Sequence, residues 1–322
     1  MTILVTGAAG FIGYHTVRRL VDAGRQVVGM DSVNDYYDVN LKRARLQGLA
    51  DHCAGQFHFQ QGEIEDPGAV DRLVRDHGVT HVIHLAAQAG VRYSIDHPEA
   101  YVDSNVMGFL KVMDACRDHG VQHLIYASSS SVYGDSSPVP FSTTARVDRP
   151  VSIYAASKLA NELMAHVYFH QFGMNMTGLR FFTVYGPWGR PDMSPYLFVK
   201  AILNGETVRL FNQGHHSRDF TYVDDIVEGI VRILDQTAEG AANRLYNIGR
   251  GQPVGLLDYV DTIERIVGIK AKRELLPMQP GDVEDTWADV TPLQNDYGYA
   301  PATDLEDGLR TFIDWYRGYH GV

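Results

Sequence analysis

Near the start of the chain stands the sequence Gly7-Ala8-Ala9-Gly10-Phe11-Ile12-Gly13, one residue after the apolar run Ile3-Leu4-Val5. The apolar run is typical of a buried strand, and the apolar spacing after the turn predicts a helix over residues 11–23. Glycines at such a turn let the backbone approach a pyrophosphate closely, and the helix that follows offers unpaired N–H groups. The GxxGxxG pattern alone is weak evidence, because glycine turns are common in α/β proteins.

Asp31 strengthens the interpretation of this turn as a dinucleotide site. It ends the next apolar run, residues 26–30, and lies 18 residues after Gly13 (31 − 13 = 18). An acidic residue in this place accepts hydrogen bonds from the adenosine ribose and repels a 2′-phosphate, so it favours NAD over NADP. The order of strand, glycine turn, helix, strand and acid therefore predicts an NAD site.

Strand-like and helical segments continue to alternate along the chain. Apolar runs at residues 80–85 and 123–127 are accompanied by helical patterns at 70–77 and 102–119. Strand–helix–strand units with this spacing imply parallel strands joined by right-handed crossovers. The fold class we expect is α/β, with a doubly wound parallel sheet of the Rossmann type.

The alternation weakens after residue 185, where prolines and glycines cluster between residues 187 and 195. Beyond this cluster, residues 218–234 predict a helix and residues 245–248 predict one more strand. A smaller C-terminal lobe that binds the substrate is the simplest explanation for the rest. The expected domains are residues 1–185 plus 218–249 for NAD, and residues 186–217 plus 250–322 for the substrate.

Composition excludes several classes of protein. The 322 residues carry 28 Lys and Arg against 39 Asp and Glu, a net charge of −11, which argues against a general nucleic-acid binder. Cys53 and Cys116 form no CxxC pattern, and no apolar run reaches the roughly 18 residues that span a bilayer. The pair His215-His216 has no third ligand near it, so we expect no metal site. We expect a soluble, cytoplasmic protein.

A tyrosine and a lysine stand four residues apart in Tyr154-Ala155-Ala156-Ser157-Lys158. On a helix these two side chains share a face. A free tyrosine has a pKa of about 10, and a neighbouring ammonium lowers this value. Such a phenol can take a proton from a substrate hydroxyl while a hydride leaves for the cofactor.

Four serines, Ser128 to Ser131, follow the apolar run that ends at Ala127. Open α/β sheets bind their ligands at the carboxyl ends of their strands, and these hydroxyls can donate hydrogen bonds to a reacting oxygen there. A polar loop that caps the next helix is the alternative explanation. Together, the glycine turn, the serines and the YxxxK pair fit one chemistry.

The whole chain resembles the extended short-chain dehydrogenase/reductase superfamily. The resemblance rests on GAAGFIG, Leu85-Ala86-Ala87, SSSSVYG and YAASK. Longer motifs are similar to those of one branch, the UDP-glucuronate 4-epimerases. They are DSVNDYYD (31–38), QAGVRYS (88–94), RFFTVYGPWGRPDM (180–193) and RDFTYVDDI (218–226).

The resemblance implies a catalytic set and a cofactor site. Tyr154 corresponds to the catalytic base, Lys158 to its partner, and Ser129 to the catalytic serine of the related UDP-galactose epimerases. Glu63 stands where such families usually have aspartate. The residues implied around NAD are Gly7, Gly10, Phe11, Ile12, Gly13, Asp31, Asn34, Lys42, Glu63, Ile64, Leu85, Ala86, Ala87, Tyr154 and Lys158.

A nucleotide-sugar carries a diphosphate and a uronate adds a carboxylate, and arginine pairs bidentately with both anions. By resemblance, Arg218 contacts the diphosphate, and Thr183 and Arg190 hold the uronate carboxylate. Arg92 either binds an anion or pairs with a carboxylate of the protein. The other residues implied around the UDP-sugar are Ser129, Ser130, Ser131, Phe211, Gln279 and Asp282.

The function that we expect is NAD-dependent 4-epimerisation of UDP-glucuronate to UDP-galacturonate through a 4-keto intermediate. Three alternatives stay open: a UDP-glucose/galactose 4-epimerase, a UDP-glucuronate decarboxylase, and a regulatory module that only binds NAD. The helical stretches 101–118 and 154–172 resemble the pair through which such proteins dimerise, so a homodimer is expected.

Overall fold

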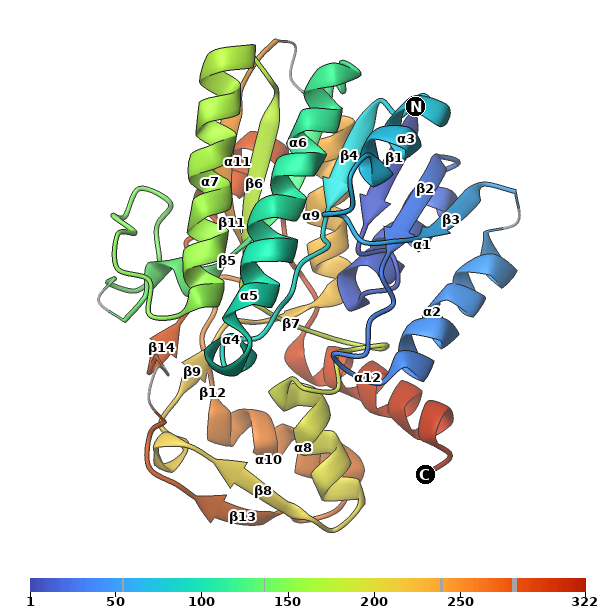
Figure 1. Cartoon of the computed structure of the whole chain (residues 1–322). Helices are drawn as coiled ribbons and strands as arrows, with labels where there is room; N and C mark the ends of the chain where they lie inside the picture. The colour runs from blue at the N-terminus through green and yellow to red at the C-terminus, as the bar shows by residue number, and fades with distance from the viewer. Residues whose placement is uncertain (54, 136, 238–239, 280–282) are drawn as a thin grey trace.

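The computed structural model describes residues 1–53, 55–135, 137–237, 240–279 and 283–322 (Figure 1). Within these residues, seven parallel strands form the central sheet in the order β11-β6-β5-β4-β1-β2-β3. The strands are β1 (Thr2–Thr6), β2 (Gln26–Asp31), β3 (Phe57–Gln61), β4 (His81–His84), β5 (His123–Ser129), β6 (Met176–Phe181) and β11 (Asn243–Ile248). The strand order reverses between β1 and β4, which is where doubly wound sheets bind ligands. The predicted fold class is confirmed.

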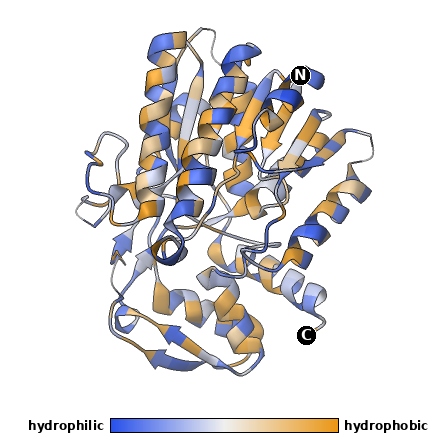
Figure 2. Cartoon of the chain, viewed as in Figure 1, coloured by the Kyte–Doolittle hydropathy of each residue, from blue (hydrophilic) through white to orange (hydrophobic). Residues whose placement is uncertain are grey.

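Helices cover both faces of this sheet, because successive side chains of a strand point to opposite faces. Ile3 and Val5 belong to one apolar cluster, whereas Leu4 between them belongs to the other. Figure 2 shows hydrophobic residues concentrated along the central strands. One cluster includes residues of α1 (Phe11–Asp22), α2 (Val39–His52) and α9 (Val223–Asp235), and the other includes residues of α3 (Ala69–Asp76), α6 (Gly108–Asp118) and α7 (Ile153–Phe172).

The segment 218–234 differs from the predicted single helix. Its first residues are extended and form β9 (Ser217–Arg218) and β10 (Phe220–Tyr222), and helix α9 begins only at Val223. The reason is the buried carboxylate of Asp219, which accepts hydrogen bonds from the backbone N–H groups of Arg250, Gly251 and Ala288. β10 also pairs with β7 (Thr183–Tyr185). These contacts with distant segments override the helical pattern.

Smaller elements lie at the lower end of the molecule in Figure 1. β8 (Thr207–Leu210) pairs with β13 (Lys272–Leu275), and β9 pairs with both β12 (Val254–Gly255) and β14 (Asp285–Thr286).

The further helices of the described chain are α4 (Tyr93–Asp96), α5 (Pro98–Tyr101), α8 (Ser194–Leu203), α10 (Leu256–Val267), α11 (Thr291–Tyr297) and α12 (Leu305–His320). None of the described helices is long and apolar enough to cross a lipid bilayer.

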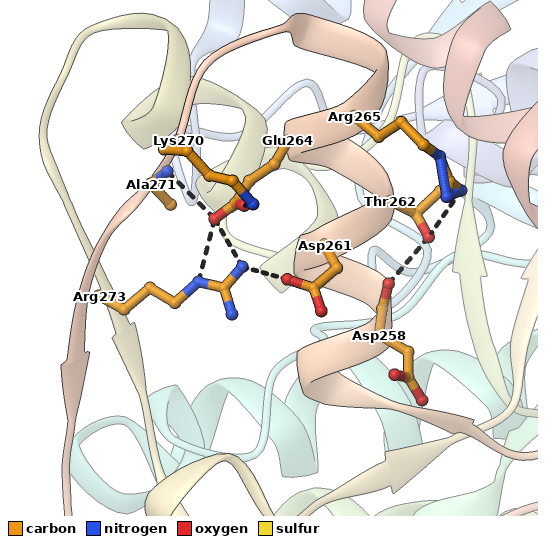
Figure 3. Close-up of polar contacts among 8 residues, drawn as sticks. All are labelled: Asp258, Asp261, Thr262, Glu264, Arg265, Lys270, Ala271 and Arg273. Atoms are coloured by element: carbon orange, nitrogen blue, oxygen red, sulfur yellow. Dashed lines mark hydrogen bonds and ion pairs between the residues drawn. The ribbon is translucent and has the colours of Figure 1, made fainter.

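The buried carboxylate of Glu264 links helix α10 to strand β13 and the residues just before it through hydrogen bonds (Figure 3). Glu264 accepts hydrogen bonds from Nζ of Lys270 at 2.6 Å, from the backbone N–H of Ala271 at 3.1 Å and from Nε of Arg273 at 3.0 Å. Arg273 also pairs with Asp261 one turn earlier on the helix. With these donors, the buried charge of Glu264 is compensated.

Candidate active site

The glycine turn connects β1 to α1 and leaves no room for larger side chains. Gly7 has a φ of +74°, and a Cβ atom on it would lie 2.8 Å from the backbone N of Ala86. A Cβ on Gly13 would lie 2.0 Å from the carbonyl oxygen of Gly7. Strand β1, the turn and helix α1 therefore pack at distances that only glycine allows. The turn forms one wall of a cavity of about 630 Å³.

Twenty of the residues that the sequence singles out line this one cavity. They are Gly7, Gly10, Phe11, Ile12, Gly13, Asp31, Asn34, Lys42, Glu63, Ile64, Leu85, Ala86, Ala87, Ser129, Ser130, Ser131, Tyr154, Lys158, Thr183 and Arg190. They come from both halves of the sheet and from the segment after β6, and they meet at the carboxyl ends of the strands.

Asp31 ends β2 beside the glycine turn, as expected from its place in the sequence. Its carboxylate accepts hydrogen bonds from the backbone N–H groups of Ala9 at 3.0 Å and of Val33 at 2.8 Å. Burial raises the pKa of Asp31, and these bonds and the charge of Lys42 partly offset the rise. Lys42 itself donates to the backbone and side-chain oxygens of Asn34, each at 2.7 Å. The acid is thus held rigidly at the rim of the cavity.

Ser129 is the last residue of β5, and the chain turns there into a short 3-10 helix (Ser130–Tyr133). The Oγ of Ser129 accepts a hydrogen bond from the backbone N–H of Ser131 and donates one to its Oγ at 3.1 Å. The serine cluster therefore caps the next turn and lines the cavity at the same time.

Tyr154 and Lys158 lie one turn apart at the start of α7. The Ser152 side chain caps this helix by accepting a hydrogen bond from the N–H of Ala155 at 3.0 Å. Nζ of Lys158 donates to the carbonyl oxygen of Ala127 in β5 at 2.9 Å. The cap and this bond place both side chains beside the end of the strand that carries Ser129.

The surroundings shift the pKa values of both residues. Burial lowers the pKa of Lys158 to about 8. Burial also raises the pKa of Tyr154, while the hydrogen bond with Ser129 and the charge of Arg190 lower it, and the net shift is upward. Lys158 is therefore a readily deprotonated amine, and Tyr154 is a neutral phenol in the chain by itself.

Thr183 and Arg190 enter the cavity from the segment between β6 and α8. The guanidinium of Arg190 forms an ion pair with Asp192, with Nη2 to Oδ2 at 2.6 Å. Thr183 and Arg190 thus line the same cavity as Ser129, Tyr154 and Lys158.

Four other predicted site residues do not line this cavity: Arg92, Phe211, Arg218 and Gln279. The Arg92 guanidinium lies over the Phe211 ring, 5.2 Å from its centroid. Arg218 donates to the backbone oxygens of Glu284 and Val283, each at 2.7 Å. Asp282 lies outside the described residues.

Several residues that line the cavity have no role predicted from the sequence. Tyr36 and Tyr37 belong to the quoted motif DSVNDYYD, so their place in a shared motif was the signal that could have found them. Asp103 and Ser104 lie in a π-helical stretch (Val102–Met107), and no pattern in the sequence marks them. Among the described residues, no group of three or more His, Cys, Asp or Glu could hold a metal ion.

Comparison with known proteins agrees with this geometry. Residues 3–249 match the model of the NAD dependent epimerase/dehydratase family. The chain belongs to this family. Members similar to it along their length include Protein CapI of Staphylococcus aureus, 45% identical over 99% of both chains, and UDP-glucuronate 4-epimerase 3 of Arabidopsis thaliana, 47% identical over 99% of this chain and 77% of the plant protein.

Solved structures of the family share the whole fold. The UDP-glucuronic acid 4-epimerase of Bacillus cereus, in complex with UDP-glucuronic acid and NAD, is 34% identical and superposes with a TM-score of 0.93 over 99% of this chain and 100% of its own. The UDP-glucose 4-epimerase of Thermus thermophilus with NAD is 29% identical, with a TM-score of 0.87 over 99% of both chains.

Proposed function

We infer that this protein is an NAD-dependent UDP-glucuronate 4-epimerase, which interconverts UDP-glucuronate and UDP-galacturonate. The observation that carries this inference is the single cavity that holds the glycine turn, Tyr154 with Lys158, and Arg190. Relatives that bear this activity as their name match nearly the whole chain at 43–47% identity, which supports the same reaction here.

The residues of the glycine turn and of the β2 end fit NAD. Glycines at positions 7 and 13 leave the cradle that a Cβ atom would fill, and Asp31 offers a carboxylate to a ribose. Lys42, Glu63, Ile64 and the segment 85–87 would enclose the rest of the dinucleotide. When bound, NAD supplies a hydride acceptor for C4 of the sugar and a positive charge beside the phenol.

Tyr154 is the proposed general base for the 4-hydroxyl group. Its phenol must lose a proton to act. The hydrogen bond with Ser129 lowers the pKa of Tyr154 against the rise caused by burial, and a protonated Lys158 would stabilise the phenolate further. In the second half of the reaction the same phenol returns the proton to the 4-keto oxygen, and the hydride would be given back to the other face of C4, so no net oxidation occurs. When the sugar is bound, the Ser129 hydroxyl would turn its one proton from Ser131 to the same oxygen, and Ser130 and Ser131 would contact the sugar.

Thr183 and Arg190 are the proposed ligands of the sugar carboxylate. A guanidinium binds a carboxylate through two parallel hydrogen bonds, which gives both affinity and orientation. The lobe of residues 186–217 and 250–322 would bind the nucleotide, with Phe211, Gln279 and Asp282 at the uridine. Arg218, the first residue after the segment 186–217, would contact the diphosphate. Residues 1–185 and 218–249 would bind NAD.

Incubation of the purified protein with UDP-glucuronate and no added NAD tests the proposal. Conversion to UDP-galacturonate, by cofactor that the protein retains, is the expected result. A product that is only UDP-pentose would instead indicate a decarboxylase, and no product at all would favour a module that binds NAD. Arg190→Ala tests the remaining alternative, a UDP-glucose/galactose 4-epimerase. If the wild type and this variant both convert UDP-glucuronate and UDP-glucose at equal rates, the neutral sugar is the substrate.

A homodimer is part of the proposal. Helix α7 exposes the apolar residues Leu163, Val167 and Phe172, and Met107 beside α6 is also exposed. A second copy of the chain would cover these residues by pairing the α6 and α7 helices across a two-fold axis. We place the enzyme in the cytoplasm, where the two free thiols stay reduced.

A further inference from the structure

The side chain of Arg190 is held in place by the carboxylate of Asp192, two residues later in the chain. Its Nε and Nη2 atoms donate to the two oxygens of Asp192, at 3.1 and 2.6 Å. These bonds use two of the five N–H donors of the guanidinium and leave the edge with Nη1 for another planar anion.

Only one member of this pair lines the cavity. Arg190 is partly buried and lines the cavity, whereas Asp192 is exposed and is not among the residues that line it. Asp192 therefore does not line the space that a substrate would fill. A carboxylate in this place fixes the plane of the guanidinium and leaves its binding edge open.

Tyr36 links the carboxylate of Asp192 to the predicted NAD-binding part of the chain through a hydrogen bond. Its hydroxyl donates to Oδ2 of Asp192 at 3.0 Å, and its ring lies under Arg190, with the guanidinium carbon 5.8 Å from the centroid. Tyr36 itself lines the cavity, five residues after Asp31 (36 − 31 = 5). One tyrosine thus touches both the arginine and its partner.

The backbone beside Arg190 is held from the same half of the chain. Trp188 has a φ of +62°, a strained conformation for a bulky residue, and its carbonyl oxygen accepts a hydrogen bond from Nη2 of Arg45 at 2.6 Å. Nη1 of Arg45, which is fully buried, donates to the Tyr37 hydroxyl at 2.7 Å and to the carbonyl oxygen of Ala9 in the glycine turn at 2.9 Å. Such strain persists only where the surroundings fix the backbone firmly.

We propose that Asp192 and Tyr36 are positioning residues that aim Arg190 at the sugar carboxylate and thereby set the preference for a uronate over a neutral hexose. The proposal rests on the proposed function, since it concerns the same carboxylate. It gives the Tyr36-Tyr37 pair a role: Tyr36 orients the guanidinium through Asp192, and Tyr37 steadies its backbone through Arg45.

Two substitutions separate orientation from charge. Asp192→Asn removes one of the two charge-assisted bonds and also removes a negative charge close to Arg190. Tyr36→Phe removes only the hydroxyl and leaves every charge in place. If Asp192 orients Arg190, both substitutions raise KM for UDP-glucuronate, by about tenfold for Asp192→Asn and about threefold for Tyr36→Phe, with a much smaller change in kcat.

Asp148→Asn is the matched control. Asp148 pairs with Arg146 at the same spacing of two residues, its Oδ2 atom 2.6 Å from Nε, and the pair is exposed and does not line the cavity. The inhibition constant of UDP, which has no carboxylate on a sugar, and the amount of NAD that the purified protein retains are measured alongside KM. We expect the control variant and both of these quantities to stay at the wild-type level.

Several outcomes would overturn the proposal. A lower KM in Asp192→Asn would show that Asp192 merely weakens the positive charge of Arg190. An unchanged KM in both variants, an equal rise in the inhibition constant of UDP, or an equal effect of Asp148→Asn would remove the positioning role. A wild-type protein that does not convert UDP-glucuronate would instead refute the proposed function, so the two failures can be told apart.

Discussion

The ammonium group of Lys158 and the carbonyl oxygen of Ala127 lie 2.9 Å apart, in a hydrogen bond that joins helix α7 to strand β5 two residues before Ser129. The lysine is almost fully buried, and burial lowers its pKa to about 8. The bond fixes the charge within the cavity, while burial makes that charge sensitive to pH near neutrality.

The first prediction concerns the dependence of the rate on pH. Catalysis needs Tyr154 deprotonated and Lys158 protonated, and this form carries one proton fewer than the neutral phenol beside a charged lysine. Because Lys158 loses its proton as pH rises through about 8, kcat/KM for UDP-glucuronate should rise with pH up to about 8 and level off above it. Lys158→Arg keeps a positive charge throughout the range, so its kcat/KM should go on rising above this pH, at a lower rate overall. Profiles of kcat/KM from pH 6 to about 10 test this, and two profiles that level off at the same pH would contradict it.

The second prediction concerns the phenol of Tyr154. Tyr154→Phe removes one oxygen from the side chain and should lower kcat by about a thousandfold, since proton transfer by a positioned group contributes roughly 10²–10⁴ to a rate. Retained NAD should not change, because the ring remains. Tyr168→Phe, whose hydroxyl on the same helix bonds Asp114 at 2.7 Å outside the cavity, serves as the control. Unchanged turnover of Tyr154→Phe would assign the proton transfer to another group.

The third prediction concerns cofactor choice. Asp31→Asn keeps the shape of the side chain but removes its negative charge. That charge would strengthen the hydrogen bond from a ribose hydroxyl and would repel a 2′-phosphate. The dissociation constant of NAD should rise about tenfold or more, and the discrimination against NADP should shrink. Calorimetric titration of cofactor-free protein with both dinucleotides measures this. Equal affinities in the wild type and the variant would exclude a ribose contact.

The sequence predicts the central part of the fold well, for a physical reason. Buried parallel strands are short apolar runs and the crossover helices are amphipathic, so β1, β2, β4 and β5 can be located from local pattern alone. The glycine turn can also be recognised from the sequence, because only glycine fits beside the backbone of Ala86 and Gly7. The extended conformation of the segment RDFTY has no such local signal, because buried Asp219 is held by hydrogen bonds from residues 31 to 69 positions away.

The site shows the same division between local and distant signals. Ser129, Tyr154 and Lys158 stand in short motifs with fixed spacing, and the structure brings them to one cavity. The bond from Tyr36 to Asp192 joins residues 156 positions apart, and no local pattern records it. The predicted uridine contacts stay predictions, since Phe211 lies against Arg92 outside the cavity.

The fourth prediction concerns stability in acid. His84 and His123 are buried, and burial lowers their pKa values to about 3 and about 4. The unfolded chain has ordinary histidines with a pKa of about 6.5, so between pH 6.5 and pH 4 it binds protons that the folded chain does not bind. Each of the two histidines should therefore lower the free energy of unfolding by about 1.4 kcal/mol per pH unit as the pH falls through this window.

His123→Gln isolates the contribution of one of these histidines. His123 bonds the hydroxyls of Thr177 at 2.9 Å and Thr237 at 3.0 Å, and glutamine can hydrogen-bond but cannot take up a proton in this range. The variant should be less stable than the wild type at pH 7. The difference should narrow on acidification, by about 0.7 kcal/mol between pH 7 and 6 and by about 1.2 kcal/mol between pH 6 and 5. Urea unfolding at pH 7, 6 and 5 measures this narrowing. His170→Gln, on the exposed side of α7, should track the wild type at every pH, and a gap for His123→Gln that stays constant would show that His123 is protonated in the folded chain.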